Sequence, residues 1–343
     1  MTSPLNLEQQ ASVTGEVDGA PVVLTMSSTA REVAEMQAGA GVADLSHVHT
    51  VRLCGPDARR FANGMFTNNI RDMKPGESIR SAMCDDRGRI QGLIDVLCTA
   101  EYAFDGVLEG VTAEWFEARY GLYIVFDDVE MEVFEADPWV LTVQGPQTMD
   151  ILAAAGLPRP ATGHHVRTDS GILVTHKDRT GLGGVDLLIP SARLSSTYQA
   201  LVDAGAFPVG FLALEHLRIG HGRPRWPVDG TEKSMVHELR IDSEVCSFNK
   251  GCYLGQEVIN RVDVKGQVNK MIHRILVDAP PDELPGAPVH LGEEQVGTIT
   301  SAAPTDHGTV GLAVLRKSAW TNGQAVKIAL PSGTVEGEVQ SLT

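Results

Sequence analysis

Two stretches of the chain share one pattern, and this repeat restricts the possible folds more than any other feature. Residues 50–65 read TVRLCGPDARRFANGM, and residues 139–156 read WVLTVQGPQTMDILAAAG. Each pattern predicts an alternating strand, a Gly-Pro break and an amphipathic helix, with Pro56 and Pro146 in the first helical turn, where no amide donor is needed. Glycine at positions 55 and 145 permits a tight strand-to-helix turn. A duplicated strand–helix unit is the simplest explanation.

The segments that follow each copy indicate an α+β fold. Residues 78–99 alternate apolar and polar side chains on both sides of DDRG, which predicts a hairpin with a glycine-containing turn. The remaining predicted elements are helices at 111–123, 191–205 and 212–220, and strands at 129–136, 171–177 and 184–190. Hairpins mixed with helices favour an α+β fold over a doubly wound α/β fold.

The predicted secondary structure changes near residue 271. From there the chain consists of short β-rich runs broken by Gly, Pro, Asn and Asp, which predicts a small all-β domain, a barrel. A chain of 343 residues is long for one hydrophobic core. We therefore expect two related α+β domains, at 1–136 and 137–269, which can exchange segments, and a C-terminal β-barrel at 270–343.

Charge and cysteine usage restrict the partners and the compartment. The net charge of −16 argues against nonspecific binding to nucleic acid or to an anionic membrane. The first residues lack a basic segment followed by an apolar one, and no eighteen apolar residues run without a charge. Five widely spaced cysteines are too few for a disulfide scaffold. A reducing cytoplasm is the expected location.

An anionic ligand would need a local basic patch, and the sequence contains one. The patch comprises Lys250, Arg261, Lys265, Lys270 and Arg274, with Arg218, Arg223 and Arg225 upstream. A solvated face is the alternative interpretation of such a cluster.

The common catalytic and metal-binding motifs are missing from the sequence. It contains no P-loop, HExxH, GxSxG or paired CxxC. The GLGGVD run at 181–186 precedes a predicted strand, so it is expected to be a loop instead of a dinucleotide-binding turn. The histidine pairs 47/49 and 164/165 have no further ligand at metal-binding spacing, so no metal site is expected.

The neighbours of Cys252 suggest a reactive thiol. Lys250 favours the thiolate, and Gly251 and Gly255 allow a sharp turn that exposes sulfur. The alternative is a small buried cysteine in a glycine-rich turn, with Gln256 and Glu257 capping the next strand or helix. The residues alone leave both interpretations open.

FNKGCYLGQEVINR, at 248–261, closely resembles the KGCYxGQE signature of the YgfZ/IBA57 group, within the glycine-cleavage T-protein (aminomethyltransferase) superfamily. The likeness continues at 41–61, at TNNI (67–70), at LEHLRIGHGRPRWPVD (214–229) and in the β-rich tail. This resemblance implies a three-domain cloverleaf around a central channel in which tetrahydrofolate binds.

The departures from the superfamily pattern distinguish its members. Gly92 and Leu93 stand where the aminomethyltransferases carry two aspartates, one of which serves the folate nitrogen. Asp95 would share the face of Leu93 if the strand alternates regularly. Leu182 stands where a glutamate grips the pterin, so pterin recognition is expected to be weaker or differently arranged.

The resemblance implies a tetrahydrofolate-binding accessory protein that assists assembly or repair of iron–sulfur clusters in client enzymes, with Cys252 as the functional thiol. It implies that these residues shape the cysteine loop: Lys250, Gly251, Tyr253, Gly255, Gln256 and Glu257. Arg218 and Arg223 are expected to meet the folate carboxylates, because arginine forks match carboxylates. Asn69 and Glu215 are further candidate folate contacts.

Two other functions remain open at this point. One is a folate-dependent aminomethyl or methyl transferase or demethylase that uses Asp95 or another acid. The other is a cysteine-dependent acyl or thiol-exchange enzyme. For the accessory protein, the expected partners are folate and iron–sulfur enzymes or assembly proteins, without nucleic acid or membrane.

Overall fold

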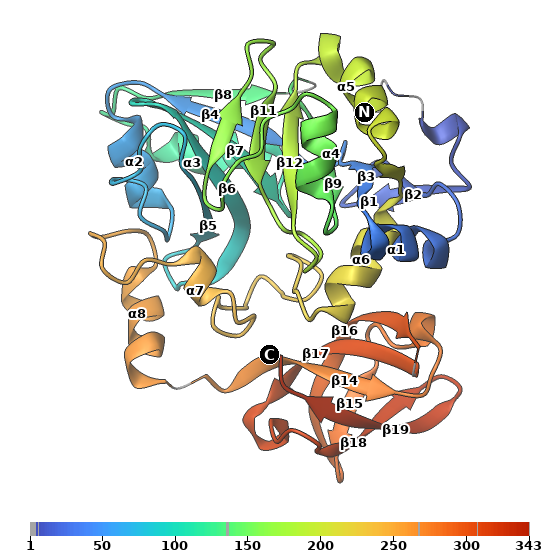
Figure 1. The fold of residues 1–343 in the computed structure, drawn as a ribbon. Helices are drawn as coiled ribbons and strands as arrows, with labels where there is room; N and C mark the ends of the chain where they lie inside the picture. Colours follow the sequence, from blue (N-terminus) through green and yellow to red (C-terminus); the bar gives the residue numbers. More distant parts are fainter. Residues whose placement is uncertain (1–4, 6, 135–136, 267, 307, 343) are drawn as a thin grey trace. The chain divides into compact units, whose positions relative to one another are not determined.

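A computed structural model describes residues 5, 7–134, 137–266, 268–306 and 308–342 (Figure 1). The chain divides into two compact units. Unit 1 comprises Met1–Ser81 and Leu93–Glu215, and unit 2 comprises Ala82–Gly92 and His216–Thr343. The three-domain division predicted from the sequence stays a prediction, and residue 136, on one side of its boundary at 136/137, lies outside the described residues.

Unit 1 begins with elements that the sequence patterns did not predict. They are the 3-10 helix η1 (Leu7–Gln9), the antiparallel pair β1 (Val13–Val17) and β2 (Ala20–Thr25), and helix α1 (Thr29–Ala38). The Ser28 side chain caps α1 by accepting a hydrogen bond from the Arg31 amide, as short polar residues do at helix starts.

The first sheet of unit 1 has five strands in the order β5-β6-β7-β4-β8. Its strands are β4 (Thr50–Cys54), β5 (Ser78–Cys84), β6 (Ile90–Ala100), β7 (Ala103–Glu109) and β8 (Glu130–Phe134), and its helices are α2 (Ala58–Met65), α3 (Ala113–Tyr120) and the 3-10 turn η2 (Gly121–Tyr123). The predicted hairpin is β5–β6, and its tip is counted in unit 2. Phe66, Phe116 and Tyr120 form a buried aromatic cluster. The last two residues of the strand predicted at 129–136 lie outside the described residues.

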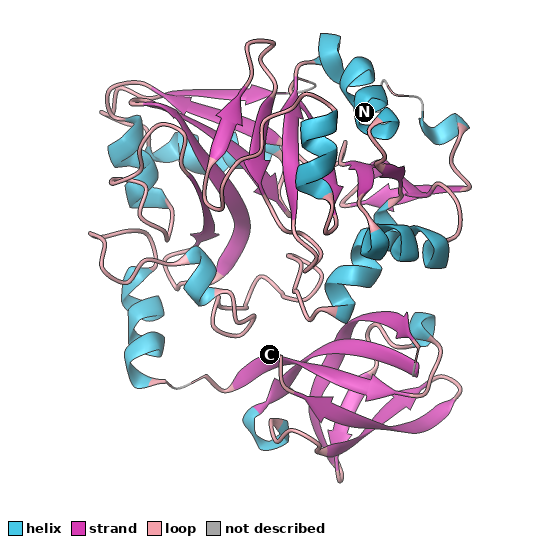
Figure 2. Ribbon diagram, in the orientation of Figure 1, coloured by secondary structure: helices cyan, strands magenta, loops and turns pink. Residues whose placement is uncertain are grey.

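The second sheet has six strands in the order β10-β11-β12-β9-β3-β13. Figure 2 shows the strands in magenta and the helices in cyan. Its strands are β3 (Gly41–Asp44), β9 (Trp139–Gln144), β10 (His165–Arg167), β11 (Leu173–His176), β12 (Gly184–Ile189) and β13 (Phe207–Pro208), and its helices are α4 (Thr148–Ala154) and α5 (Ser191–Asp203). Leu141 and Leu187 on the strands pack with Leu152 on α4 and Leu194 on α5 in one buried cluster.

The two copies of the repeated pattern adopt the same local structure. β4 leads to α2 and β9 leads to α4, and the glycine between strand and helix has a positive φ in each copy, +120° at Gly55 and +142° at Gly145. A Cβ atom at either glycine would overlap a backbone carbonyl oxygen, that of Asp128 or of Gly39. Only glycine fits both requirements.

The predicted position of the two prolines was wrong. The helix caps are Asp57 and Gln147, so Pro56 and Pro146 lie one residue before the caps and outside the helices. In each copy a hydrogen bond closes the strand-to-helix turn, from the Ala58 amide to the Gly55 carbonyl oxygen and from the Thr148 amide to the Gly145 carbonyl oxygen. The helix begins only after this turn.

Unit 2 contains the end of α6 (Phe211–Gly220), the short α7 (Asp242–Val245), α8 (Gln256–Lys265) and a closed barrel in the order β14-β17-β16-β15-β18-β19. The barrel strands are β14 (Lys270–Val277), β15 (Pro288–Leu291), β16 (Glu294–Thr305), β17 (Gly308–Arg316), β18 (Ala325–Leu330) and β19 (Gly333–Gln340), with 3-10 turns η3 (Pro281–Glu283) and η4 (Lys317–Ala319). Ile275, Val289, Ile299 and Ile328 fill its interior. The α+β fold class and the C-terminal barrel are thus confirmed, and no described helix is long and apolar enough to span a membrane.

Candidate functional site

The KGCYLGQE segment lies in unit 2, runs from the loop after α7 into the first turn of α8, and contains both exposed and buried residues. Gly251 and Cys252 are exposed, whereas Lys250 and Tyr253 are buried. The Lys250 Nζ lies 4.9 Å from the centre of the Tyr253 ring, a cation–π contact that holds the two ends of the turn together. The loop therefore presents the Cys252 thiol to solvent.

Cys252 differs in accessibility from the other four cysteines. Cys84, Cys98 and Cys246 are buried, Cys54 is half-buried and Cys252 is exposed. Burial, with the neighbouring Cys246 thiol, raises the pKa of Cys84 well above its ordinary value, so that thiol stays protonated. Of the two sequence-based interpretations of Cys252, the structure favours the accessible thiol over the buried one.

Gly255 fixes the backbone of the loop against the DDRG turn of the β5–β6 hairpin. Its φ is +84°, and a Cβ atom there would lie 2.5 Å from the carbonyl oxygen of Asp85 and 3.0 Å from the Cα of Gly88. The Asp85 carboxylate in turn accepts hydrogen bonds from the amides of Arg87 (2.9 Å) and Arg89 (2.8 Å). The two glycine-containing motifs are thus parts of one structure in unit 2.

Gln256 and Glu257 form the first turn of α8, directly after Gly255 as its N-cap. The exposed Glu257 carboxylate lies at the positive end of the helix dipole, which stabilises the helix. These two residues therefore have a structural role in the helix start, and any contact with a ligand stays a prediction.

Two side chains buried in unit 2 carry polar groups without hydrogen-bond partners among the described residues. The Tyr253 hydroxyl and both ring nitrogens of His237 are buried and unpartnered. Burial, with the nearby Cys246 and Cys84 thiols, raises the pKa of Tyr253, and burial lowers the pKa of His237. Both side chains are neutral at pH 7.

Arg218 is buried and has several bonding partners within unit 2. Its Nη1 lies 2.7 Å from the Asp229 carboxylate and donates to the Arg223 carbonyl oxygen (3.0 Å), and its Nη2 donates to Ser301 Oγ (3.1 Å). Asp229 is also buried and accepts hydrogen bonds from Thr300 and Ser301 on β16. Arg218 thus anchors the turn that carries the half-buried Arg223.

Asn69 and Glu215, the other candidate folate contacts, belong to unit 1. The Asn69 amide group donates to Asp72 (2.7 Å), while its Oδ1 is buried and has no hydrogen-bond partner among the described residues. Glu215 is half-buried in α6.

The family model of the GCVT N-terminal domain matches residues 21–250, which is more than half of the chain. The chain belongs to this family. The predicted T-protein superfamily is thereby confirmed, and the finer YgfZ/IBA57 assignment stays a prediction.

Similar proteins agree with membership of the GCVT family. A chloroplastic protein of Arabidopsis thaliana, named as a transferase, is 25% identical over 319 residues, which cover 89% of this chain and 72% of that protein. The aminomethyltransferase of Halothermothrix orenii is 25% identical over 317 residues, 88% of this chain and 87% of that enzyme. The crystal structure of the glycine cleavage system aminomethyltransferase T of Bartonella henselae has a TM-score of 0.89 at 21% identity, covering 98% of this chain and 94% of that one. This last likeness shows the fold.

Within the GCVT family, this chain lacks carboxylates at the two positions that the resemblance assigns to the transferase aspartates. Gly92 has no side chain, and Leu93 is buried on β6. Leu182, at the position assigned to the pterin-gripping glutamate, is half-buried in the loop before β12.

Asp95 is held in an ion pair. Its carboxylate lies 2.7 Å from the Lys177 Nζ. Burial by itself would raise the pKa of Asp95, but the charges of Lys177, Arg80 and Arg179 outweigh burial and hold that pKa below its ordinary value. Asp95 is therefore ionised and engaged with Lys177.

Asp95 belongs to a larger cluster of charges in unit 1 that sequence reasoning missed. Arg80 pairs with Glu109 (2.6 Å), and Arg179 pairs with Asp186 (2.6 Å). Arg80, Asp95 and Glu109 come from the neighbouring strands β5, β6 and β7, and the other members from the 177–186 region. A signal was present, because charged residues interrupt strands that are otherwise apolar.

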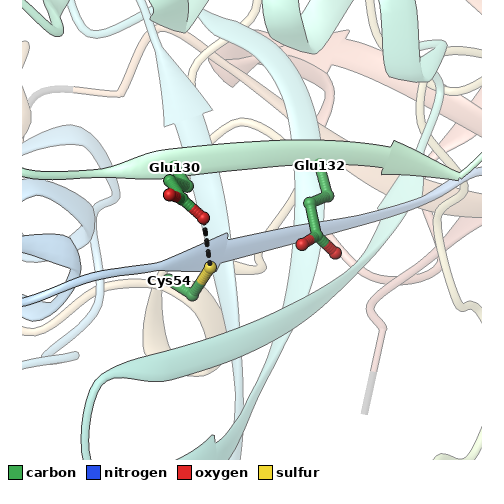
Figure 3. Close-up of side chains that lie close together, drawn as sticks. All are labelled: Cys54, Glu130 and Glu132. Atoms are coloured by element: carbon green, nitrogen blue, oxygen red, sulfur yellow. Dashed lines mark hydrogen bonds between the residues drawn. The ribbon is translucent and has the colours of Figure 1, made fainter.

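A second titratable cluster lies on β4 and β8, where Cys54 faces Glu130 and Glu132 (Figure 3). The Cys54 Sγ is 3.9 Å from a Glu130 oxygen, and the possible ligand atoms of all three lie within 4.8 Å of one another. Burial, followed by the two glutamates, raises the pKa of Cys54. Both glutamate carboxylates are exposed to solvent, and Glu132 also lies 3.9 Å from Arg52. Solvent and the arginine therefore already compensate the negative charge of the two carboxylates.

Proposed function

We propose that this protein is a tetrahydrofolate-binding accessory factor that assists assembly or repair of iron–sulfur clusters in client enzymes through Cys252. The observation that supports this role best is the exposed Cys252 thiol on a loop whose backbone is held against the DDRG turn. A fixed, accessible thiol suits chemistry on a partner, whereas Cys84 and Cys246 are buried.

Membership of the GCVT family and relatives named as aminomethyltransferases support tetrahydrofolate as the ligand. The residues of the chain fit such a ligand in part. Arg223 would bind a folate carboxylate, and Arg218 would position Arg223 through the hydrogen bond to its carbonyl oxygen. Bound tetrahydrofolate would supply a carrier for one-carbon units.

The second candidate function is a one-carbon transferase or demethylase, favoured by the names of the relatives. It would need a carboxylate in place of those absent at Gly92 and Leu93, and Asp95 is the nearest in sequence. The ion pair between Asp95 and Lys177 makes that carboxylate a weak base, which counts against this function.

A cysteine-dependent acyl or thiol-exchange enzyme also uses an exposed thiol. Such an enzyme needs a group that activates the nucleophile. Among the described residues, Cys252 has no hydrogen-bond or ion-pair partner, and the Lys250 ammonium lies against the Tyr253 ring. The accessory role requires only that the thiol be accessible.

Calorimetry with tetrahydrofolate, followed by product analysis, separates the two folate-dependent functions. The accessory role predicts binding without methylene- or methyltetrahydrofolate formation from aminomethyl or methyl donors. Arg223→Ala should weaken binding, whereas Cys252→Ala and the surface control Arg316→Ala should bind like the wild type. Turnover that disappears in Asp95→Asn would establish the transferase instead, and absence of any binding would remove the folate part of the proposal.

A further inference from the structure

The segment between α3 and β8 exposes an unusual group of large apolar side chains. Leu122 is 75% exposed, Val125 66% and Phe126 97%, and Tyr123 is also exposed. These four residues, here called the 122–126 patch, are four of the nine exposed large hydrophobic residues in the described part of the chain. Single exposed apolar residues are ordinary, but a contiguous group marks an interaction surface.

The 122–126 patch is presented on a well-anchored segment. On its C-terminal side, the Asp128 amide donates to the Asp57 carboxylate (3.0 Å) and the Asp57 amide donates to the Asp128 carbonyl oxygen (3.2 Å). Arg60 bridges Asp127 (2.5 Å) and Asp57 (3.3 Å). These bonds tie the segment to the start of α2.

The N-terminal side of the patch is also fixed. The 3-10 turn η2 continues directly from α3, and the Ile124 amide donates to the Gly121 carbonyl oxygen. The Arg119 guanidinium lies 5.8 Å from the centre of the Tyr123 ring. A patch ordered before binding costs less conformational entropy on association than a flexible one.

The charged residues that flank the patch in the sequence are mainly acidic. Between residues 114 and 130 there are five acidic residues and one arginine: Glu114, Glu117, Asp127, Asp128 and Glu130, against Arg119. Asp127 is neutralised by Arg60, while Glu114, Glu117, Asp128 and Glu130 are exposed. An apolar centre with an acidic margin complements an apolar surface with a basic margin.

We infer that the 122–126 patch docks a protein segment that presents apolar side chains together with lysine or arginine, such as a basic amphipathic helix. A second copy of the chain would bring two acidic margins together, and an anionic membrane would be repelled by them. The inference concerns unit 1 and does not depend on the role of Cys252 or on folate.

A synthetic 14-residue peptide of leucine and lysine at helical spacing, carrying a fluorophore, is the probe. Its anisotropy should show saturable binding to the full chain at physiological salt. Leu122→Ser/Phe126→Ser should weaken that binding about tenfold or more, because two apolar side chains leave the contact while the net charge is unchanged. The control Val13→Ser/Val264→Ser, which removes two separate exposed apolar side chains, should bind like the wild type.

Two further arms test the charge argument. Glu117→Lys should weaken the binding of the leucine–lysine peptide, and a matched leucine–glutamate peptide should not bind to the wild type. Equal binding of both peptides, or equal losses in the patch and control variants, would overturn the inference. Dimerisation that depends on the patch would overturn the inference in favour of a second copy of the chain. Patch-dependent binding to phosphatidylcholine vesicles without peptide binding would overturn it in favour of a lipid surface. All variants alter exposed side chains, so unchanged circular dichroism and Tm will show that each remains folded.

Discussion

Gly255 and Asp85, 170 positions apart along the chain, approach so closely that a Cβ atom on the glycine would lie 2.5 Å from the aspartate carbonyl oxygen. The contact joins the cysteine loop to the DDRG turn. It gives a physical reason for glycine at this position of KGCYLGQE, independent of any ligand.

Gly255→Ala is expected to lower the free energy of unfolding by about 2–4 kcal/mol, because the new Cβ meets backbone and φ is positive. Gly266→Ala, at the other end of α8, is the matched control. Its φ is +58°, but a Cβ there has no atom within 4 Å, so only about 1–2 kcal/mol should be lost. Urea unfolding measures both, and equal losses would show that the close approach has no energetic weight.

Arg218→Met should cost about 3–5 kcal/mol of stability, because it leaves the buried Asp229 carboxylate without its cation. Arg316→Met removes an arginine from an exposed pair with Glu294 and should cost no more than about 1 kcal/mol. If urea unfolding gives similar losses for both, the Arg218–Asp229 pair does not anchor the turn.

The stability of the protein should fall as the pH drops from about 6.5 to about 4, in part because of His165. Burial, followed by the charge of Arg167, lowers the pKa of His165 to about 4 from 6.5. The unfolded chain then binds a proton that the folded chain does not, so acid favours unfolding in this window and the effect is complete below the folded pKa.

Replacing His165 tests this contribution. Between pH 7 and pH 5 the wild type should lose about 2 kcal/mol more stability than His165→Gln, as the pKa difference implies. The comparison uses urea unfolding at both pH values, because other groups titrate equally in both proteins. Parallel losses would mean that His165 titrates normally in the folded state.

Alkylation should distinguish the five thiols. Brief treatment of the folded protein with iodoacetamide should modify Cys252 at least about tenfold faster than Cys84 or Cys246, since access limits the buried thiols. Peptide mass spectrometry gives the rate for each site, with half-buried Cys54 as an internal reference. A Cys252 rate no higher than that of the buried thiols would show that the loop does not present its sulfur.

Much of the fold could be predicted because local sequence patterns determine where the strands, helices and turns form. The alternation in the two repeated stretches and in the barrel strands reports which face of each strand is buried, and the glycines at 55 and 145 mark the turns. Pro56 and Pro146 were misplaced because nothing local shows where helical hydrogen bonding begins.

The site was harder to predict because it depends on contacts between distant segments. Cys252 is exposed because its neighbours Lys250 and Tyr253 are buried against each other. The pairing of Arg218 with Asp229 appears only in the folded chain. Likewise, Asp95 is two residues from Leu93 on a strand with regular register there, whereas its ion-pair partner Lys177 lies 82 positions further along the chain.

Complementation in cells tests whether Cys252 supports iron–sulfur enzymes. Cells lacking the native protein can be supplied with wild type, Cys252→Ala or Cys54→Ala, and the activity of cluster-dependent enzymes measured at matched protein levels. Wild type and Cys54→Ala should restore this activity, whereas Cys252→Ala should not, although it folds and binds tetrahydrofolate. Full restoration by Cys252→Ala would mean that the Cys252 thiol has no role in supporting these enzymes.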